Sequence, residues 1–485
     1  MTTKTARNCA ALLVLLYGLV AIWRGERIPV NDGFGWDGVV YGEITKDFSG
    51  QVFGGKLNGY YLQRIFPCAV VHYGLRLMGL STTDGPNVLR GFQVYNALLL
   101  VLGVYVWWAV AAKLRLSARA TWLGFVALYV NFAALKMPFY YAVLSDTTAF
   151  VGGLIVLYCF LADKPFLLFL TGLLGAFSWP IFLHVTLLLM LFPCQAAMPS
   201  GPSLRLPAWL YAIPGVLVCL LTFHGYFIDG KPLPSYAEPI WPATAPLALA
   251  LVVLYLVLSV RELTNRGLLD RLVRPFREVT RRSAILTAAL FMTYAIAFAL
   301  LRSSGQACLG TRAFIEGACL SSIAKPGIFL VSHAVYFGPI VFLTILAWPR
   351  VCSAIRGHGL GFTAALFLGL VLSITSESRH LLCFFPLFVA VTMQAIDTGP
   401  FNWRHDGAFI ATSVLASKCW LTLNQGPFSG RYSDFPFQYY FMNQGPLMSD
   451  WCYAVQATVA LALFFLFAML ATKPVVDGTK PAPIY

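Results

Sequence analysis

The sequence is poor in charged residues. Asp, Glu, Lys and Arg together make up 11% of its 485 residues, less than half of the share of about 25% that is usual in soluble domains. Hydrophobic residues make up 59%. This composition excludes an ordinary soluble globular protein and indicates a chain that lies mostly inside a membrane.

The sequence also lacks a soluble domain, a tandem repeat and a low-complexity tract. It has no C-x-x-C pair and no spacing typical of a zinc site, so we expect no metal and no other cofactor. Most cysteines are scattered through apolar segments as small apolar residues. Cys308 and Cys319 share one predicted loop, and they are a disulfide candidate if that loop faces an oxidising compartment.

What the sequence has in abundance is apolar runs, and roughly 20 such residues span a bilayer. The first run, Ala10–Trp23, follows Lys4 and Arg7 and has no small-residue cleavage pattern, so we expect an uncleaved helix. Another run, 166–193, is interrupted at Ser178–Pro180 and predicts two short helices. We therefore predict an all-α, polytopic transmembrane helical bundle of about 12–14 helices. Its other helices are expected near 92–112, 118–135, 141–162, 207–226, 243–260, 283–301, 327–348, 359–375, 380–396, 407–422 and 453–471.

The distribution of positive charge predicts how the bundle is oriented. The segment 261–282 is rich in arginine and is typical of a basic amphipathic helix on the cytoplasmic side. This choice places both termini inside, with a single membrane domain over 1–472 and a cytoplasmic tail over 473–485. Most of the net charge of +14 then falls on the inner loops, which makes it a topology signal and not a sign of nucleic-acid binding.

This orientation creates a long outer first loop, 24–91, provided that Ile65–Leu80 lies in the interface and does not span. Lys136–Asp146, Ser376–His380 and an aromatic loop at 424–452 fall on the same outer face. The aromatic residues of that late loop suit stacking on sugars or, equally, an aromatic belt at the membrane interface.

The first loop contains the sequence NDGFGWDGVVYGE, which concentrates carboxylates beside a membrane. Glycines on either side of Asp37 permit tight turns and positive φ, so the backbone can turn this carboxylate toward a substrate. The alternative is that Asp37 caps a helix beginning at Gly38. Asp32, between Asn31 and a glycine, is more typical of a structural turn. Arg64, in YYLQRIFP, either binds a phosphate or anchors an interfacial helix by snorkelling.

Two further groups of polar residues are predicted at helix ends on this face. Asp146 begins a spanning helix and is either a site residue or a helix cap. The segment SESRHLLCFFP brings Glu377, Arg379 and His380 together, and arginine binds phosphate oxygens through paired hydrogen bonds. A local Glu–Arg pair at a helix end is the alternative. The predicted outer face thus has both cations and carboxylates. Cations there suit a phosphorylated leaving group, and carboxylates suit a nucleophile that needs a base.

These segments resemble the GT-C superfamily of polytopic membrane glycosyltransferases. GWDGVVYGEI followed by YYLQRIFP looks like a [YW]DGxxYxxI motif with a downstream RRIxYP-like motif in bacterial members, and SESRHLLCFFP resembles their E-x-R-[YH]-L-L…P segment. The resemblance covers only the first loop and the region of Glu377. The second motif has one arginine here instead of two, which weakens the assignment of a phosphate-binding role to Arg64.

The resemblance implies an inverting transferase in the bacterial inner membrane that uses a polyprenyl-phosphate sugar at the periplasmic face. Its partners would be membrane lipid, the lipid-linked donor and a glycan, lipid or protein acceptor, without metal and without nucleic acid. Asp37 matches the general base and Asp146 the second acidic site, while Arg379 and His380, with Arg64, match the region that handles donor phosphate. We expect Trp36, Tyr41 and Glu377 to contact substrate.

Two other functional classes remain open. An O-antigen polymerase or ligase typically uses arginines in a large late outer loop, but the loop here has only Arg431. A transporter or lipid flippase often has internal repeats and paired broken helices, whereas 166–193 is the one broken run and has no counterpart in the sequence.

Overall fold

The computed structural model describes residues 3–194, 212–228, 230, 240–264, 279–302, 311–399, 403–424 and 444–470. Every regular element in these ranges is helical, and the one β-contact among them is an isolated antiparallel bridge between Glu377 and Gln444. The predicted all-α helical bundle is therefore confirmed.

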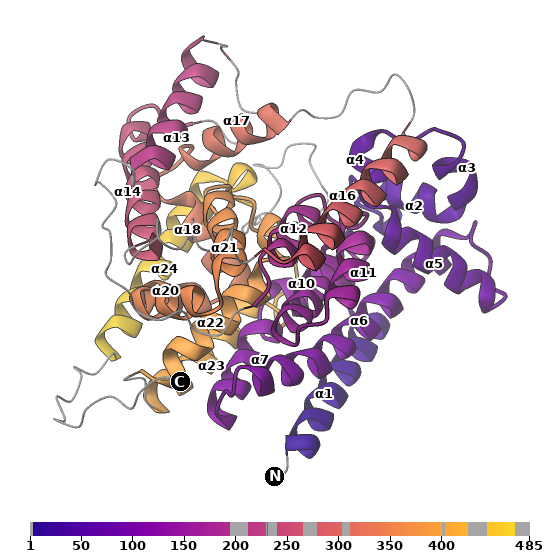
Figure 1. Cartoon of the computed structure of the whole chain (residues 1–485), viewed down its shortest axis with the longest axis horizontal. Helices are drawn as coiled ribbons and strands as arrows, with labels where there is room; N and C mark the ends of the chain where they lie inside the picture. The colour runs from indigo at the N-terminus through magenta and orange to yellow at the C-terminus, as the bar shows by residue number, and fades with distance from the viewer. Residues whose placement is uncertain are drawn as a thin grey trace.

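The first part of the chain forms two long helices joined by short ones. Helices α1 and α6 pack along each other, and the short helices gather at one end of α6, opposite the N-terminus (Figure 1). The side chain of Asp84 caps the start of α6 through the backbone N–H of Asn87, and Pro86 suits the first turn because it lacks a donor. These elements are α1 (Thr3–Arg24), η1 (Val30–Gly33), α2 (Gly38–Lys46), α3 (Phe48–Val52), α4 (Gly59–Leu62), α5 (Ile65–Leu77) and α6 (Gly85–Lys113).

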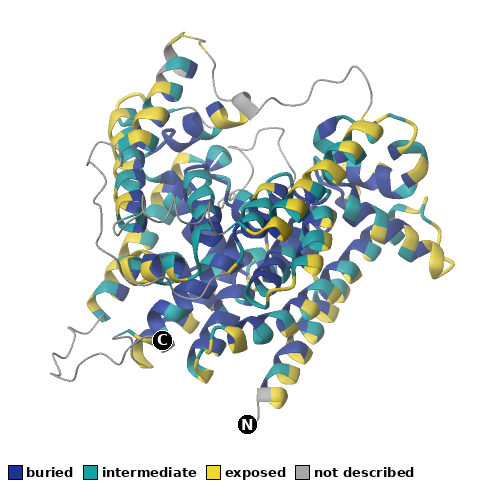
Figure 2. Ribbon diagram, in the orientation of Figure 1, coloured by how far each residue is buried: buried dark blue, intermediate teal, exposed yellow. Residues whose placement is uncertain are grey.

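The rest of the chain continues as short and medium helices around a buried centre (Figure 2). They are α7 (Ala118–Tyr129), α8 (Phe132–Leu135), α9 (Met137–Tyr140), α10 (Asp146–Leu161), α11 (Pro165–Ala176), α12 (Phe182–Leu191), α13 (Ile213–Phe223), η3 (His224–Ile228), α14 (Ala245–Thr264), α16 (Arg281–Leu301), α17 (Thr311–Ser322), α18 (Ile328–Phe337), α19 (Ile340–Leu346), α20 (Trp348–Gly357), α21 (Leu360–Leu372), η4 (Ser378–Leu381), α22 (Phe385–Asp397), α23 (Trp403–Ser417), η7 (Gly445–Leu447) and α24 (Asp450–Leu470).

Five of the described helices are individually long and apolar enough to cross a membrane, and up to seven if two bent pairs each count as one span. The apolar runs predict more spans of full length. The difference arises because several runs are divided by turns into helices of 10–17 residues. Helices α16 and α24 leave most of their apolar side chains exposed, with only 6% and 11% of their most apolar windows buried. Such surfaces need lipid around them, so the chain is an integral membrane protein.

The predicted break at Ser178–Pro180 is confirmed. Helix α11 ends at Ala176, and α12 begins at Phe182. The N–H of Trp179 still bonds to the carbonyl oxygen of Gly175 at 2.8 Å, but Pro180 has no donor with which to continue the ladder. The break holds Trp179 in the protein interior, where it is 3% exposed.

Close packing at one glycine positions α10. An added Cβ on Gly153 would lie 2.4 Å from the carbonyl oxygen of Cys383, in the turn between η4 and α22. Only a residue without a side chain permits this approach. It fixes the distance between the start of α10, which carries Asp146, and η4, which carries Arg379.

Some predictions concern residues outside the described ranges. Most of the basic segment 261–282 and most of the loop 424–452 lie there, as does Cys308. Cys319 is a buried free thiol packed with Val218 and Val252, and the Cys308–Cys319 disulfide stays a prediction because Cys308 lies outside the described residues. Cys319 lies on the apolar side of α17, which packs against α13 and α14 and is therefore buried.

Candidate active site

Asp37 lies at the start of α2, on a backbone fixed by Tyr141. The hydroxyl of Tyr141 accepts hydrogen bonds from the backbone N–H groups of Trp36 at 2.7 Å and Gly38 at 3.2 Å. An added Cβ on Gly35 would lie 2.3 Å from the ring of this tyrosine, and Gly35 has a φ of +67°. Glycine is therefore required for the loop to close on Tyr141.

The Asp37 carboxylate makes no helix-capping hydrogen bond, in contrast to the alternative interpretation of this residue. It instead accepts a hydrogen bond from the hydroxyl of Tyr60, at 3.3 Å from Oδ2. The side chain therefore points from the first loop toward α4, where it is available to a ligand.

Asp146 pairs with Arg379 across a large sequence separation. Nη2 of Arg379 donates to Oδ1 of Asp146 at 3.1 Å, and both side chains are largely buried. The other carboxylate oxygen, Oδ2, has no hydrogen-bond partner within the described residues, so Asp146 does not cap its own helix. Glu377 lies farther from the guanidinium, with 3.7 Å between Oε1 and Nη1.

Arg64 is 6% exposed and does not reach toward solvent as a snorkelling residue would. It donates from Nη1 to the carbonyl oxygen of Tyr60 at 2.7 Å, and its guanidinium lies over the Tyr60 ring at 3.8 Å. The same guanidinium also lies 5.6 Å from the centroid of the Trp179 ring. The guanidinium of Arg379 also lies against Trp179, at 5.8 Å. One indole therefore holds two guanidinium groups near each other by cation–π contact.

Electrostatic interactions and buried donors connect several of the residues that the sequence predicted as site residues. Arg379 is within electrostatic reach of Asp37, Tyr60, Asp146 and Glu377. Arg64 and Arg379 each keep a buried Nε without a partner among the described residues. Buried donors of this kind are costly to leave unpaired, and their clustering indicates a place for an anionic ligand.

The other predicted residues surround this centre in different ways. His380 contacts Trp179 with ring centroids 6.4 Å apart and lies 3.7 Å from Glu377. Tyr41 is 1% exposed and packs edge-on against Tyr61. The ring of Trp36 packs against Tyr141.

Asp32 and Glu43 are not part of this cluster. Val39, Glu43 and Lys46 share one face of α2, and by the roughly 100° per residue of an α-helix this face is opposite the one on which Asp37 and Tyr41 lie. Asp32 and Glu43 line a separate polar hollow of about 420 Å³, where Glu43 pairs with Lys46 at 2.8 Å.

Sequence reasoning missed Tyr60, Trp179 and Tyr141 as site residues. Trp179 carried a signal, because its helix break at Ser178–Pro180 was visible. Tyr60 lies one turn before Arg64, and this spacing places both on the same side of the chain. Nothing in the sequence pointed to Tyr141.

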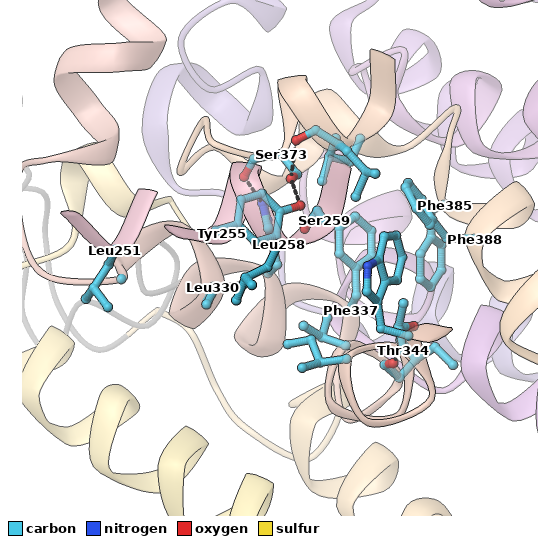
Figure 3. Close-up of a pocket in the computed structure, with 18 of the residues that line it drawn as sticks. Leu251, Tyr255, Leu258, Ser259, Leu330, Phe337, Thr344, Ser373, Phe385 and Phe388 are labelled. Atoms are coloured by element: carbon cyan, nitrogen blue, oxygen red, sulfur yellow. Dashed lines mark hydrogen bonds between the residues drawn. The ribbon is translucent and has the colours of Figure 1, made fainter. Parts of the chain in front are cut away.

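An apolar cavity of about 460 Å³ lies beside the segment that carries Arg379 (Figure 3). Leucine and phenylalanine side chains from α14, α18 and α22 line it, together with Leu381, two residues after Arg379. His333, in the wall of the cavity, is hydrogen-bonded to η4. Its Nδ1 lies 2.9 Å from the hydroxyl of Ser378, and its Nε2 lies 2.7 Å from the carbonyl oxygen of Ser373. The cavity has room for a hydrocarbon chain, and Leu381 and the His333–Ser378 contact connect its wall to the segment that carries Arg379.

Among the described residues, no group of three or more His, Cys, Asp or Glu side chains is arranged to hold a metal ion. No protein-family model and no curated protein matches the sequence. A solved structure with a similar arrangement is the archaeal oligosaccharyltransferase AglB from Archaeoglobus fulgidus, in complex with an inhibitory peptide and a dolichol-phosphate. It shares 12% identity with a TM-score of 0.39, over 96% of this chain and 55% of that chain. This chain thus spans about half the length of that protein.

Proposed function

We propose that the protein is a GT-C-type glycosyltransferase that transfers a sugar from a polyprenyl-phosphate donor to a hydroxyl of a glycan, lipid or protein acceptor. The observation that supports this most directly is that the Asp37 carboxylate is linked through Tyr60 to Arg64 and lies within electrostatic reach of Arg379, the two arginines that contact Trp179. A base and an anion site close together are the two requirements of this reaction.

Asp37 is the general base in this proposal. It takes the proton from the acceptor hydroxyl while that oxygen attacks the anomeric carbon. The bond from this carbon to the phosphate oxygen breaks, and the phosphate leaves with the electron pair. A single displacement inverts the configuration, and the products are the glycosylated acceptor, polyprenyl phosphate and a proton on Asp37. A positioned base contributes about 10²–10⁴-fold to such a step.

Arg64 and Arg379 receive the phosphate. Their unpaired Nε groups face no competing acceptor among the described residues, so phosphate oxygens can bond to them directly. Asp146 holds Arg379 in place through its 3.1 Å contact. His380 and Glu377 complete the surroundings of this guanidinium.

The apolar cavity supports a lipid-linked donor. Its lining is almost entirely hydrocarbon, and Leu381 connects it to the phosphate-binding segment. A chain lying there places its phosphate near Arg379. In the proposed topology the enzyme lies in a bacterial inner membrane, with this site at the periplasmic face and both termini in the cytoplasm.

The test is the variant Asp37→Asn, purified in detergent and assayed with a panel of polyprenyl-phosphate sugars and membrane extracts as acceptors. We expect transfer to fall by about 10²-fold or more, while binding of undecaprenyl phosphate, followed by native mass spectrometry, stays intact. Asp32→Asn is the matched control, because Asp32 lies in the same loop but outside the cluster. Wild-type transfer by Asp37→Asn would refute the role of Asp37.

A further inference from the structure

Tyr60 makes a contact that the proposed reaction does not yet use. Its hydroxyl donates to Oδ2 of Asp37 at 3.3 Å. Among the described residues, this is the hydrogen bond that the Asp37 side chain accepts. Within that part of the chain, the other oxygen, Oδ1, is the one left to meet an acceptor hydroxyl.

The ring of Tyr60 is itself held by Arg64. The guanidinium covers the ring at 3.8 Å and bonds to the backbone carbonyl oxygen of the same residue at 2.7 Å. Tyr61 packs edge-on against the ring, with centroids 5.1 Å apart. Asn58 caps this short helix through the N–H of Tyr61 at 3.0 Å. Tyr60 is therefore restrained through its ring, its backbone and its hydroxyl.

We propose that Tyr60 is a positioning residue that orients the Asp37 carboxylate and links it, through Arg64, to the part of the site that receives phosphate. This proposal rests on the proposed function and names a residue through which the base and the phosphate site are connected. A phosphate bound to Arg64 contacts the same guanidinium that is stacked on the Tyr60 ring.

The protonation state of Tyr60 agrees with this role. Burial raises the pKa of the Tyr60 hydroxyl, and the nearby Asp37 raises it further, although Arg64 opposes the shift. The hydroxyl therefore stays protonated and remains a donor at neutral pH.

The test is Tyr60→Phe, with Tyr61→Phe as the matched control on the same helix. Phe at 60 keeps the ring under Arg64 and removes only the donor. We expect kcat to fall by about 10- to 100-fold, the loss typical of a hydrogen bond to a charged group, with an unchanged KM for the donor.

A double-mutant cycle provides the second measurement. If Tyr60 acts through Asp37, Tyr60→Phe has no further effect on the residual transfer of Asp37→Asn. Wild-type kcat would overturn the proposal, as would an equal loss in Tyr61→Phe or additive losses in the cycle. Failure of the proposed function would be seen separately, as full activity of Asp37→Asn.

Discussion

Gly153→Ala tests whether the packing of α10 sets the geometry of the site. The new Cβ would lie 2.4 Å from the carbonyl oxygen of Cys383, whereas ordinary van der Waals contact begins at 3.4 Å. The obstacle is backbone and cannot rotate away. Either α10 or the turn after η4 must move by about 1 Å, the difference between these two distances.

This displacement acts on the pair of Asp146 and Arg379, because α10 begins with Asp146 and Cys383 lies four residues after Arg379. Overpacking of this kind costs about 1–3 kcal/mol of stability. A misplacement of 1 Å in a catalytic site can cost about 10²-fold in rate. We therefore expect a lower melting temperature in detergent, weaker binding of undecaprenyl phosphate and transfer reduced by about one to two orders of magnitude.

Gly152→Ala is the control. Its Cβ would lie 3.0 Å from the ring edge of Phe182, a side chain that can adjust. We expect a small stability loss and near-normal transfer. If Gly153→Ala behaves like Gly152→Ala in both melting and transfer, then the close approach of α10 does not determine the site geometry.

Two further variants test other parts of the structure. Glu26→Gln should destabilise the protein by about 1–3 kcal/mol, because Glu26 pairs with Lys136 at 2.6 Å and accepts the N–H groups of Leu423 and Asn424. Thermal melting measures this loss, and an unchanged melting temperature would show that the pair is dispensable. Trp179→Leu should weaken binding of undecaprenyl phosphate by about 5- to 30-fold, since it removes two cation–π interactions that are each worth about 0.5–1 kcal/mol or more. Binding titrations by native mass spectrometry measure this change, and unaltered affinity would contradict the role given to the indole.

The helical fold followed from the sequence where apolar length and backbone chemistry act locally. The break at Ser178–Pro180 was predictable because proline removes a donor. The run at 118–135 was expected as one helix, but the side chain of Asn131 bonds to the N–H of Ala134 at 2.9 Å and starts a new one. The run at 141–162 begins late, since Asn96 takes the carbonyl oxygens of Pro138 and Ala142. The Asn131 cap is a local contact and the Asn96 hydrogen bonds are tertiary contacts, and hydropathy carries no information about either.

The sequence likewise predicted some features of the candidate site and missed others. Asp37, Asp146 and Arg379 were predictable because charged residues beside apolar segments are rare and costly. Their convergence was not, as it depends on Gly153 and on the bend at Trp179. Tyr60 escaped notice because an interfacial tyrosine is ordinary in a membrane protein, and its hydroxyl matters only through its distance to Asp37.

The unpaired polar atoms of this centre have an energetic consequence. Arg64 Nε, Arg379 Nε and Asp146 Oδ2 are buried without partners among the described residues, and each such group costs about 1–3 kcal/mol. A fold selected only for stability would pair these atoms or replace them with apolar ones. A ligand that supplies phosphate oxygens satisfies the two arginine donors in the folded state alone, so it must stabilise that state by mass action. Undecaprenyl phosphate should therefore raise the melting temperature of the wild-type protein, and it should do so less for Arg379→Lys, which retains the charge but has no Nε donor in that position.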